Sequence, residues 1–260
     1  MIKYKIQSEA LKVKPTIEYI AQNTKNISKL EEFSKNHDTI LHVARNPNCP
    51  IDLLKELSNK KFNVKYAVAE NIKCPIYMLH NFSNSSNRYL RSYVAKNVNC
   101  SVEILEKLSK DWDYCVRSDT AYNSNCPVEI LEKLSNDSNY SVRRSVAKNR
   151  NCPVKLLEKL SDDSDWRVRC YVAYNPNCPV KLLEKLSNDW DYRVGCGVAD
   201  NPNCPVEVLK KLSDDCVQVL LTVIENPNCT VEILEKLSHH SDSIVQKYAL
   251  LKQEELLNVK

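Results

Sequence analysis

The side chains in this 260-residue chain that are best suited to metal, redox or nucleophilic chemistry are its twelve cysteines. Eight of them follow one another at intervals of 25 or 26 residues, each in the motif N-x-N-C or a close variant of it. A thiol at the start of a helix can have a lowered pKa and act as a nucleophile. Three or four converging thiols can hold zinc or an iron–sulfur cluster. The eight are Cys49, Cys74, Cys100, Cys126, Cys152, Cys178, Cys204 and Cys229.

The spacing of this cysteine ladder argues against such chemistry. Equivalent residues of neighbouring repeats should lie roughly 8–10 Å apart, the distance between packed helices. A disulfide needs Cα atoms closer than about 7 Å, and zinc needs sulfurs at about 2.3 Å from one ion. A catalyst needs one nucleophile rather than eight equivalents, and no C-x-x-C pair occurs. We predict buried, reduced thiols with no metal and no cofactor, and a redox or metal-binding protein is the least favoured alternative. Cys170 and Cys196 lie outside the ladder and are expected to be more exposed.

A second ladder consists of arginines, with aspartates shortly upstream of their positions. The arginines could contact phosphate groups, or they could bridge neighbouring repeats through Asp–Arg pairs. Because these arginines recur from repeat to repeat, we favour bridging, which would fix the register of the repeats more than it would add stability. The residues are Arg91, Arg117, Arg143 and Arg169, with Asp113, Asp165 and Asp191.

The remaining candidates for catalysis form no motif. The five histidines are scattered, and the only glycines, Gly195 and Gly197, exclude a glycine-rich phosphate loop. No nucleophile, base and orienting group can be identified together. We therefore predict that the protein is not an enzyme.

The elements that position these ladders are internal repeats. Residues 123–148, 149–174 and 175–200 are three versions of one sequence, and a fixed period of this length indicates a solenoid. A degenerate repeat occupies residues 23–45, as is usual at the end of a solenoid. We expect an N-terminal segment or cap at residues 1–22, one repeat domain at 23–250, and a C-terminal cap or tail at 251–260. Eight better repeats start at Asn46, Asn71, Asn97, Asn123, Asn149, Asn175, Asn201 and Asn226.

Each repeat has the pattern of two short helices. In the repeat from residue 123, Pro127 stands where a first helix begins, and Val128, Leu131 and Leu134 follow at helical spacing. A second helix begins near Tyr140 and ends before the next N-x-N-C. Two helices within 26 residues leave no room for a strand, so the predicted fold class is all-α.

These motifs resemble the leucine-rich repeat variant family. The resemblance rests on LEKL at residues 157–160, DSDW at 163–166, VRCYVA at 168–173 and NPNCP at 175–179, and it recurs over about residues 23–250. It implies a HEAT-like, right-handed superhelix of alternating α- and 3₁₀-helices, and it implies little about function. One family member carries an iron–sulfur cluster in a cysteine-rich N-terminal segment. Here the first cysteine, Cys49, already lies inside a repeat, so no cluster is carried over.

Composition and charge restrict the partners only weakly. The net charge is +4, from 37 basic and 33 acidic residues, which is too balanced to demand nucleic acid. The first residues lack the apolar core of a signal peptide. No run of about 18 apolar residues is present. We expect a cytoplasmic protein with no membrane partner.

Comparison of the repeats with one another separates a recurring face from a variable one. In the second helix of each repeat the variable positions fall within an arc roughly 100° wide, and the recurring positions fill the opposite side. In stacked repeats this arc forms a stripe. Its candidate partner-binding residues are Tyr89, Tyr93, Lys96, Tyr122, Arg144, Lys148, Arg167, Tyr171, Tyr174 and Arg193.

The stripe leads to competing hypotheses. Extended, variable surfaces are what solenoids use for binding, and mixed Arg and Tyr suit protein interfaces. The first hypothesis is a non-catalytic scaffold that binds a protein partner through repeats two to six. The second is a nucleic-acid-binding solenoid. The third is an enzyme or redox protein. Against all of them stands the simpler interpretation that the stripe is merely solvated surface. Trp112 and Trp190 occupy a turn position, where they could be exposed anchors or cover a repeat junction.

Overall fold

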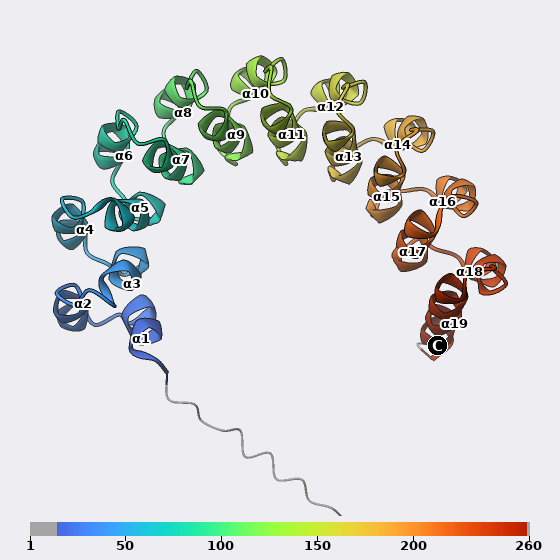
Figure 1. The fold of residues 1–260 in the computed structure, drawn as a ribbon, viewed down its shortest axis with the longest axis horizontal. Helices are drawn as coiled ribbons and strands as arrows, with labels where there is room; N and C mark the ends of the chain where they lie inside the picture. Colours follow the sequence, from blue (N-terminus) through green and yellow to red (C-terminus); the bar gives the residue numbers. More distant parts are fainter. Residues whose placement is uncertain (1–14, 259–260) are drawn as a thin grey trace, which may run out of the picture. The chain divides into compact units, whose positions relative to one another are not determined.

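The computed structural model describes residues 15–258, and every regular element in that range is an α-helix. The described residues form nineteen helices and no strand, which confirms the predicted all-α repeat solenoid (Figure 1). The chain divides into two compact units, residues 1–84 and 85–260. Each unit is described by itself, and the single repeat domain expected over residues 23–250 stays a prediction. Most of the expected N-terminal segment, residues 1–14, lies outside the described residues.

The first unit contains six described helices. Thr16 caps the first of them by accepting a hydrogen bond from the backbone N–H of Tyr19. The helices are α1 (Ile17–Asn23), α2 (Ile27–Phe33), α3 (Ile40–Arg45), α4 (Ile51–Leu57), α5 (Phe62–Glu70) and α6 (Ile76–Phe82).

The second unit contains thirteen described helices and all of the predicted stripe. Its odd-numbered helices are α7 (Arg88–Lys96), α9 (Tyr114–Tyr122), α11 (Tyr140–Lys148), α13 (Trp166–Tyr174), α15 (Tyr192–Asp200), α17 (Val217–Glu225) and α19 (Ser243–Asn258). Its even-numbered helices are α8 (Val102–Leu108), α10 (Val128–Leu134), α12 (Val154–Leu160), α14 (Val180–Leu186), α16 (Val206–Leu212) and α18 (Val231–Ser238). Both kinds of helix are α-helical, so the 3₁₀-helices that the family resemblance implies do not occur among the described elements.

Local sequence signals account for both kinds of helix. Pro127 caps α10 from an extended conformation, so this helix begins one residue later than its proline suggests. In α11, the side chain of Asn139 accepts a hydrogen bond from the N–H of Ser141, as an N-cap residue should. The chain leaves α11 at Asn149, whose backbone is extended.

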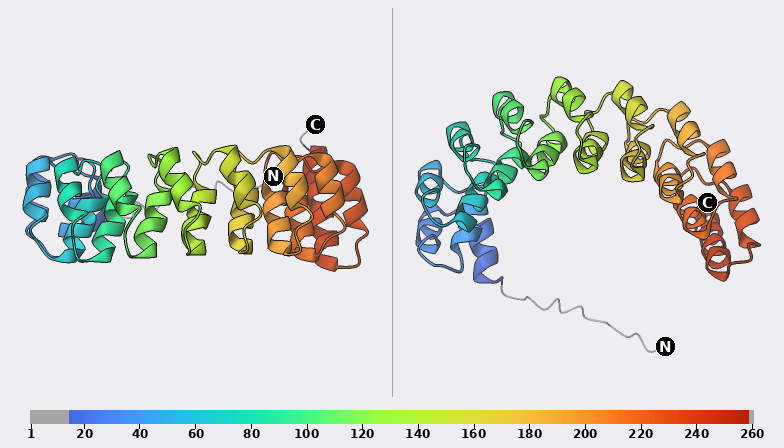
Figure 2. Two further views of the ribbon diagram at one scale, coloured as in Figure 1. Left: turned by 90° about the horizontal axis from the view of Figure 1, so that it is seen from above. Right: turned by 45° about the horizontal axis from the view of Figure 1, so that its top comes forward.

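Stacking, rather than helix propensity, stabilises these elements. A seven-residue helix is marginal by itself in water. In α10 the side chains of Ile130, Leu131 and Leu134 are buried, and in α11 those of Val142 and Val146 are buried. Full burial of such a side chain contributes about 1.5–3 kcal/mol. Within residues 85–260 the odd-numbered helices line the inner side of the curved stack (Figure 1), and the helices run across the stacking direction (Figure 2).

Buried asparagines connect each repeat to the one before it. The side-chain amide of Asn149 donates hydrogen bonds to the carbonyl oxygens of Ala121 at 2.7 Å and Asn123 at 2.9 Å. Its own oxygen accepts from the N–H of Asn151 at 2.8 Å. Asn123, Asn175, Asn201 and Asn226 repeat this arrangement. The first asparagine of N-x-N-C therefore satisfies backbone groups at each repeat junction.

The arginine ladder bridges neighbouring repeats, as the sequence predicted. Arg143 donates to both carboxylate oxygens of Asp163 in the next repeat, at 2.6 and 2.9 Å. Its third contact, at 2.8 Å, is the carbonyl oxygen of Asp137. The acidic partners are not the predicted ones, because Asp165 and Asp191 cap α13 and α15 instead. The bridged pairs are Arg91–Asp111, Arg117–Asp137, Arg143–Asp163 and Arg169–Asp189.

Candidate functional site

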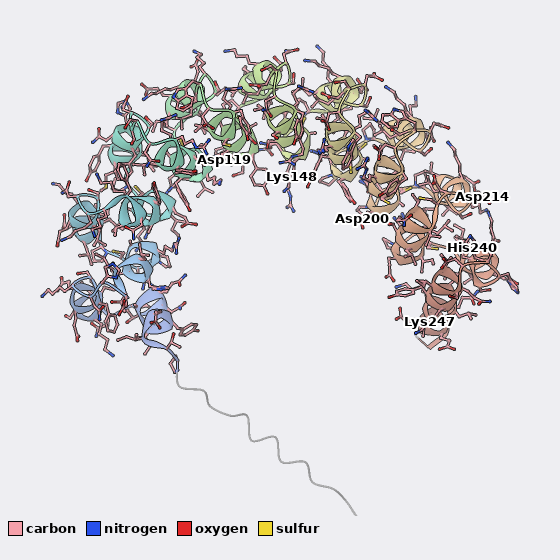
Figure 3. All side chains as sticks on the ribbon, in the orientation of Figure 1. Asp119, Lys148, Asp200, Asp214, His240 and Lys247 are labelled. Atoms are coloured by element: carbon pink, nitrogen blue, oxygen red, sulfur yellow. The ribbon has the colours of Figure 1, made fainter. Side chains whose placement is uncertain are left out.

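Five of the predicted stripe residues meet at one groove in the second unit. The groove has a volume of about 960 Å³ and lies at the C-terminal ends of α7, α9, α11 and α13 and the loops that follow them. Figure 3 shows Lys148 extending from α11 on the inner side of this unit. The stripe residues that line the groove are Lys96, Tyr122, Lys148, Tyr171 and Tyr174.

The centre of the groove is a lysine held between tyrosine rings. The ammonium of Lys148 lies 4.8 Å from the ring centroid of Tyr122 and 5.5 Å from that of Tyr171. The guanidinium of Arg144 lies 5.7 Å from the Tyr171 ring, and the rings of Tyr171 and Tyr174 are 6.0 Å apart. Such cation–π contacts are worth roughly 0.5–1 kcal/mol each at exposed sites. They restrain Lys148 within the groove and Arg144 beside it without neutralising either cation.

The ionic partners of the groove cations differ from repeat to repeat. Lys96 pairs with Asp119 of α9 at 3.3 Å, and Ser92 also donates to that carboxylate. Burial raises the pKa of Asp119, although Ser92 and Lys96 oppose the shift. Among the described residues, Arg144, Lys148 and Arg150 form no ion pair, and no Asp or Glu lines the groove.

One tyrosine of the groove, Tyr174, has a raised pKa. Burial, followed by the nearby Cys170 and Asp200, raises the pKa of Tyr174 to about 12. Its hydroxyl is therefore a neutral hydrogen-bonding group.

Three other predicted stripe residues lie away from the groove, near the N-terminal ends of their helices. Arg193 pairs with Asp191 at 2.6 Å and stacks 3.6 Å above the Trp166 ring, and Arg167 pairs with Asp165 at 3.2 Å. The Tyr89 ring lies beneath the guanidinium of Arg88. These side chains already have partners within the second unit, so they form a separate surface.

The tenth predicted residue, Tyr93, is half-buried on α7 beside the groove. Its ring lies 5.8 Å from the ammonium of Lys96. Tyr93 therefore borders the groove through a residue that lines it.

Some positions of the variable stripe pack against the neighbouring repeat. Ser145 is buried and shares a 2.8 Å hydrogen bond with Ser118. The expectation that Cys170 is exposed is wrong, because its thiol is buried and lies 3.2 Å from the carbonyl oxygen of Arg193. Variation between repeats therefore reflects packing at these positions as well as exposure.

Seven of the eight ladder cysteines are buried and Cys229 is half-buried, and the ladder thiols are poor nucleophiles. Burial raises the pKa of Cys126, Cys152 and Cys178 to about 12. These thiols stay protonated at neutral pH, and every cysteine in the chain is a free thiol. Among the described residues no group of three or more His, Cys, Asp or Glu side chains is placed to hold a metal ion.

The two tryptophans of the turn position are exposed. Trp112 is 75% and Trp190 is 81% exposed. Each ring has the guanidinium of a bridging arginine at 5.2 Å, from Arg91 and Arg169. They do not bury the repeat junction, and whether they anchor a partner stays a prediction.

Comparison of the second helices alone missed the groove residues contributed by loops. Arg150 lies in the loop after α11 and lines the groove. It occupies the x of N-x-N-C, which is Val98, Ser124 and Pro176 in the neighbouring repeats. The variation at this position is a signal that the same comparison, extended to the loops, would have detected.

Comparison with known proteins places the fold. Residues 166–191 match the family model described as leucine rich repeat variant. A solved structure described as a leucine-rich repeat variant with a novel repetitive structural motif is 22% identical, with 89% of each chain covered and a TM-score of 0.55. A crystal structure of an engineered protein is 18% identical over 88% of this chain and 96% of that one, with a TM-score of 0.27, which is too low to support an argument. No curated protein matches.

The described residues include no helix long and apolar enough to span a membrane. The repeats that flank residues 166–191 have the same two-helix architecture as the matched one. The chain is therefore a helical repeat solenoid with the leucine-rich repeat variant fold, and its repeat at residues 166–191 matches that family.

Proposed function

We propose that this protein is a non-catalytic scaffold that binds a protein partner along the groove formed by α7, α9, α11 and α13. The observation that carries this proposal is the contrast between two sets of residues. The asparagines and arginines that join the repeats recur, whereas the stripe side chains that line the groove differ between neighbouring repeats. A constant frame with a variable, open surface is the arrangement by which solenoids bind partners.

The composition of the groove supports a protein partner. Tyr122 and Tyr174 are exposed, and both rings are large apolar surfaces with a polar hydroxyl. Tyrosine and arginine are enriched at protein interfaces, where they dominate the binding energy. The non-catalytic part of the proposal is supported by the raised pKa of the ladder thiols, which removes the most abundant candidate nucleophile.

The second candidate function is nucleic-acid binding. It is favoured by Arg144, Lys148 and Arg150, three cations without ionic partners among the described residues. This candidate predicts that log Kd changes linearly with log salt concentration, with a slope set by the number of phosphates contacted.

A pull-down from cell lysate, with and without nuclease, tests both candidates. Wild type is compared with the variant Arg144→Glu, Lys148→Glu, Tyr171→Ala. A control variant, Lys155→Glu, Lys181→Glu, changes the charge by the same amount on the even-numbered helices, where both lysines are exposed. Circular dichroism and thermal unfolding confirm that all three proteins are folded.

The protein-binding proposal expects a protein captured by wild type and by the control variant, but not by the groove variant, and unaffected by nuclease. Capture that nuclease abolishes supports the second candidate. Equal capture by all three proteins means that the groove is only solvated surface, and the proposal is then wrong.

A further inference from the structure

The three cations without ionic partners are concentrated in a single repeat. Arg144 and Lys148 belong to α11, and Arg150 follows in the next loop. The cations around them are compensated, since Lys96, Arg167 and Arg193 each pair with an aspartate. Lys148 and Arg150 line the groove, and Arg144 lies beside it against the ring of Tyr171. These three positive charges are a local excess, and the lining has no carboxylate.

The scaffold does not require these cations. The position of Arg144 is held by Ser118 and Cys170 in the flanking repeats, and that of Lys148 by Tyr122 and Tyr174. The position of Arg150 is held by a serine and a proline in those repeats. The flanking helices α9 and α13 nevertheless both pack against α11. Three cations gathered where the fold accepts neutral residues point to a charged ligand.

The aromatic rings hold these cations in place for a ligand. The ammonium of Lys148 is held between Tyr122 and Tyr171, and the guanidinium of Arg144 lies over Tyr171. A charged side chain that is already restrained loses less entropy on binding. Because neutral rings rather than carboxylates provide the restraint, the positive charge stays available to an anion.

The extent of the groove fits an extended chain. Its lining runs from Lys96 on α7 to Tyr174 on α13, which is three steps between neighbouring odd-numbered helices. With packed helices roughly 8–10 Å apart, this is about 24–30 Å. An extended peptide advances about 3.3 Å per residue, so the groove accommodates about eight residues.

The same features favour a peptide over nucleic acid. Proteins that bind single strands stack bases on open aromatic faces. Here, cationic side chains already lie over the rings of Tyr122 and Tyr171. Beyond the groove the inner side carries Asp200, an exposed carboxylate that would repel a continuing phosphate backbone.

We propose that the groove binds an extended acidic segment of a partner protein, about eight residues long, whose carboxylates pair with Arg144, Lys148 and Arg150. This inference rests on the proposed function, because it specifies the partner of the same groove. Tyr122 and Tyr174 then contact the apolar parts of the segment.

Fluorescence anisotropy with defined probes tests this proposal. The probes are a fluorescein-labelled nonapeptide with Asp and Glu at alternate positions, its Asn and Gln counterpart, and nine-nucleotide poly-U RNA and poly-dT DNA. Wild type is expected to bind the acidic peptide at least ten-fold more tightly than the amide counterpart and than either nucleic acid.

The decisive variant carries the residues of the preceding repeat, which the fold already accepts: Arg144→Ser, Lys148→Tyr and Arg150→Ser. It is expected to lose at least ten-fold in affinity for the acidic peptide. The control Lys133→Gln, Lys155→Gln, Lys181→Gln also removes three positive charges, from exposed positions on the even-numbered helices, and is expected to bind like wild type.

Three results would overturn the inference: equal binding of the acidic and amide peptides, tighter binding of RNA or DNA, or equal losses in both triple variants. The lysate experiment distinguishes this failure from failure of the proposed function. If the groove variant still loses a nuclease-resistant protein partner while the acidic peptide does not bind, the scaffold proposal stands and the acidic-segment proposal falls. If capture is also unchanged, both are wrong.

Discussion

At the scale of single residues, the asparagine that opens each repeat holds the stack together. Asn149 uses both ends of its amide, donating to two buried carbonyl oxygens of the previous repeat and accepting from the N–H of Asn151. A buried carbonyl that loses its donor retains the penalty of desolvation. Asn151 also donates to the previous repeat, to Ser124, but from an exposed position where water can replace it.

We therefore expect Asn149→Ala to lower the free energy of unfolding by about 2–3 kcal/mol, and Asn151→Ala by about 1 kcal/mol or less. Urea denaturation followed by circular dichroism measures both. Equal losses in the two variants would contradict the assignment of Asn149 as the buried junction residue.

The Asp–Arg bridges link stability to pH at the same scale. Burial alone raises the pKa of Asp163, but hydrogen bonds from Arg143 and the N–H of Asp165, with the nearby positive charges, outweigh it and hold the pKa below its ordinary value. A carboxyl whose pKa is lowered by folding stabilises the fold above its unfolded-state pKa, about 3.9. This stabilisation is lost as the pH falls through the lower, folded-state value.

Wild type should therefore lose more stability between pH 5 and pH 3 than the variant Arg143→Gln, which lacks the bridge. Guanidinium chloride denaturation at both pH values measures the difference. Asp119, whose pKa burial raises, has the opposite dependence on pH, but it is common to both proteins and cancels in the comparison. If both proteins lose the same free energy of unfolding between pH 5 and pH 3, the bridge does not link stability to pH.

At the scale of elements, small side chains set how closely the odd-numbered helices approach one another. A Cβ added at Gly197 would lie 2.9 Å from the carbonyl oxygen of Cys170 and 3.2 Å from the Cβ of Ala173, both on α13. At Gly195 the nearest atom, in Val219, would be at 3.4 Å, an ordinary contact. Close packing against α13 therefore requires a glycine at position 197, whereas the space around position 195 accepts a Cβ.

Replacement by alanine should separate the two glycines. Gly195→Ala is expected to stabilise by about 0.5–1 kcal/mol, because glycine is the poorer helix former. Gly197→Ala is expected to destabilise by about 1–3 kcal/mol, because the backbone of α13 must move. Thermal unfolding measures the stability of both variants. If Gly197→Ala stabilises the protein, α13 and α15 can move apart without a loss of stability.

At the scale of the whole molecule, the ladder thiols report on the opening of the stack. Burial raises the pKa of Cys100 and Cys204 to about 12, whereas Cys115 and Cys216 are half-buried at the helix starts. Reaction requires a thiolate and access to it. The seven buried ladder thiols can therefore react only when the repeats around them open.

In native protein at pH 8, a thiol reagent such as Ellman's reagent should modify Cys115 and Cys216 first and the ladder on the slower time scale of unfolding. Mass spectrometry of partly modified protein identifies the sites. The double variant Cys115→Ser, Cys216→Ser should lose the fastest phase, because burial raises the pKa of the other two half-buried thiols, Cys196 and Cys229. Rapid modification of any of the seven buried ladder cysteines would contradict its burial.

Much of the architecture was predictable because it depends on local sequence signals that recur in every repeat. The period, the two helices and the all-α class follow from proline, capping residues and apolar spacing, all of which act within a few residues. The bridging role of the arginine ladder and the burial of most ladder cysteines were predicted from the recurrence of these residues in the repeats. The role of Asn149 was missed, since its partners lie 28 and 26 residues away and are backbone atoms that the sequence does not distinguish.

Helical periodicity assigns each residue an angle around its axis, so the variable helix face could be identified from the repeats alone. Which of those residues act together depends on how the repeats pack. Arg167 and Tyr174 share a face of α13 but, at 1.5 Å per residue, are separated by about 10 Å along it. One pairs with the capping Asp165, and the other joins Lys148 and the loop residue Arg150 in the groove. Position along the axis and pairing with caps are properties of the stacked repeats, so they emerge only when the helices are packed.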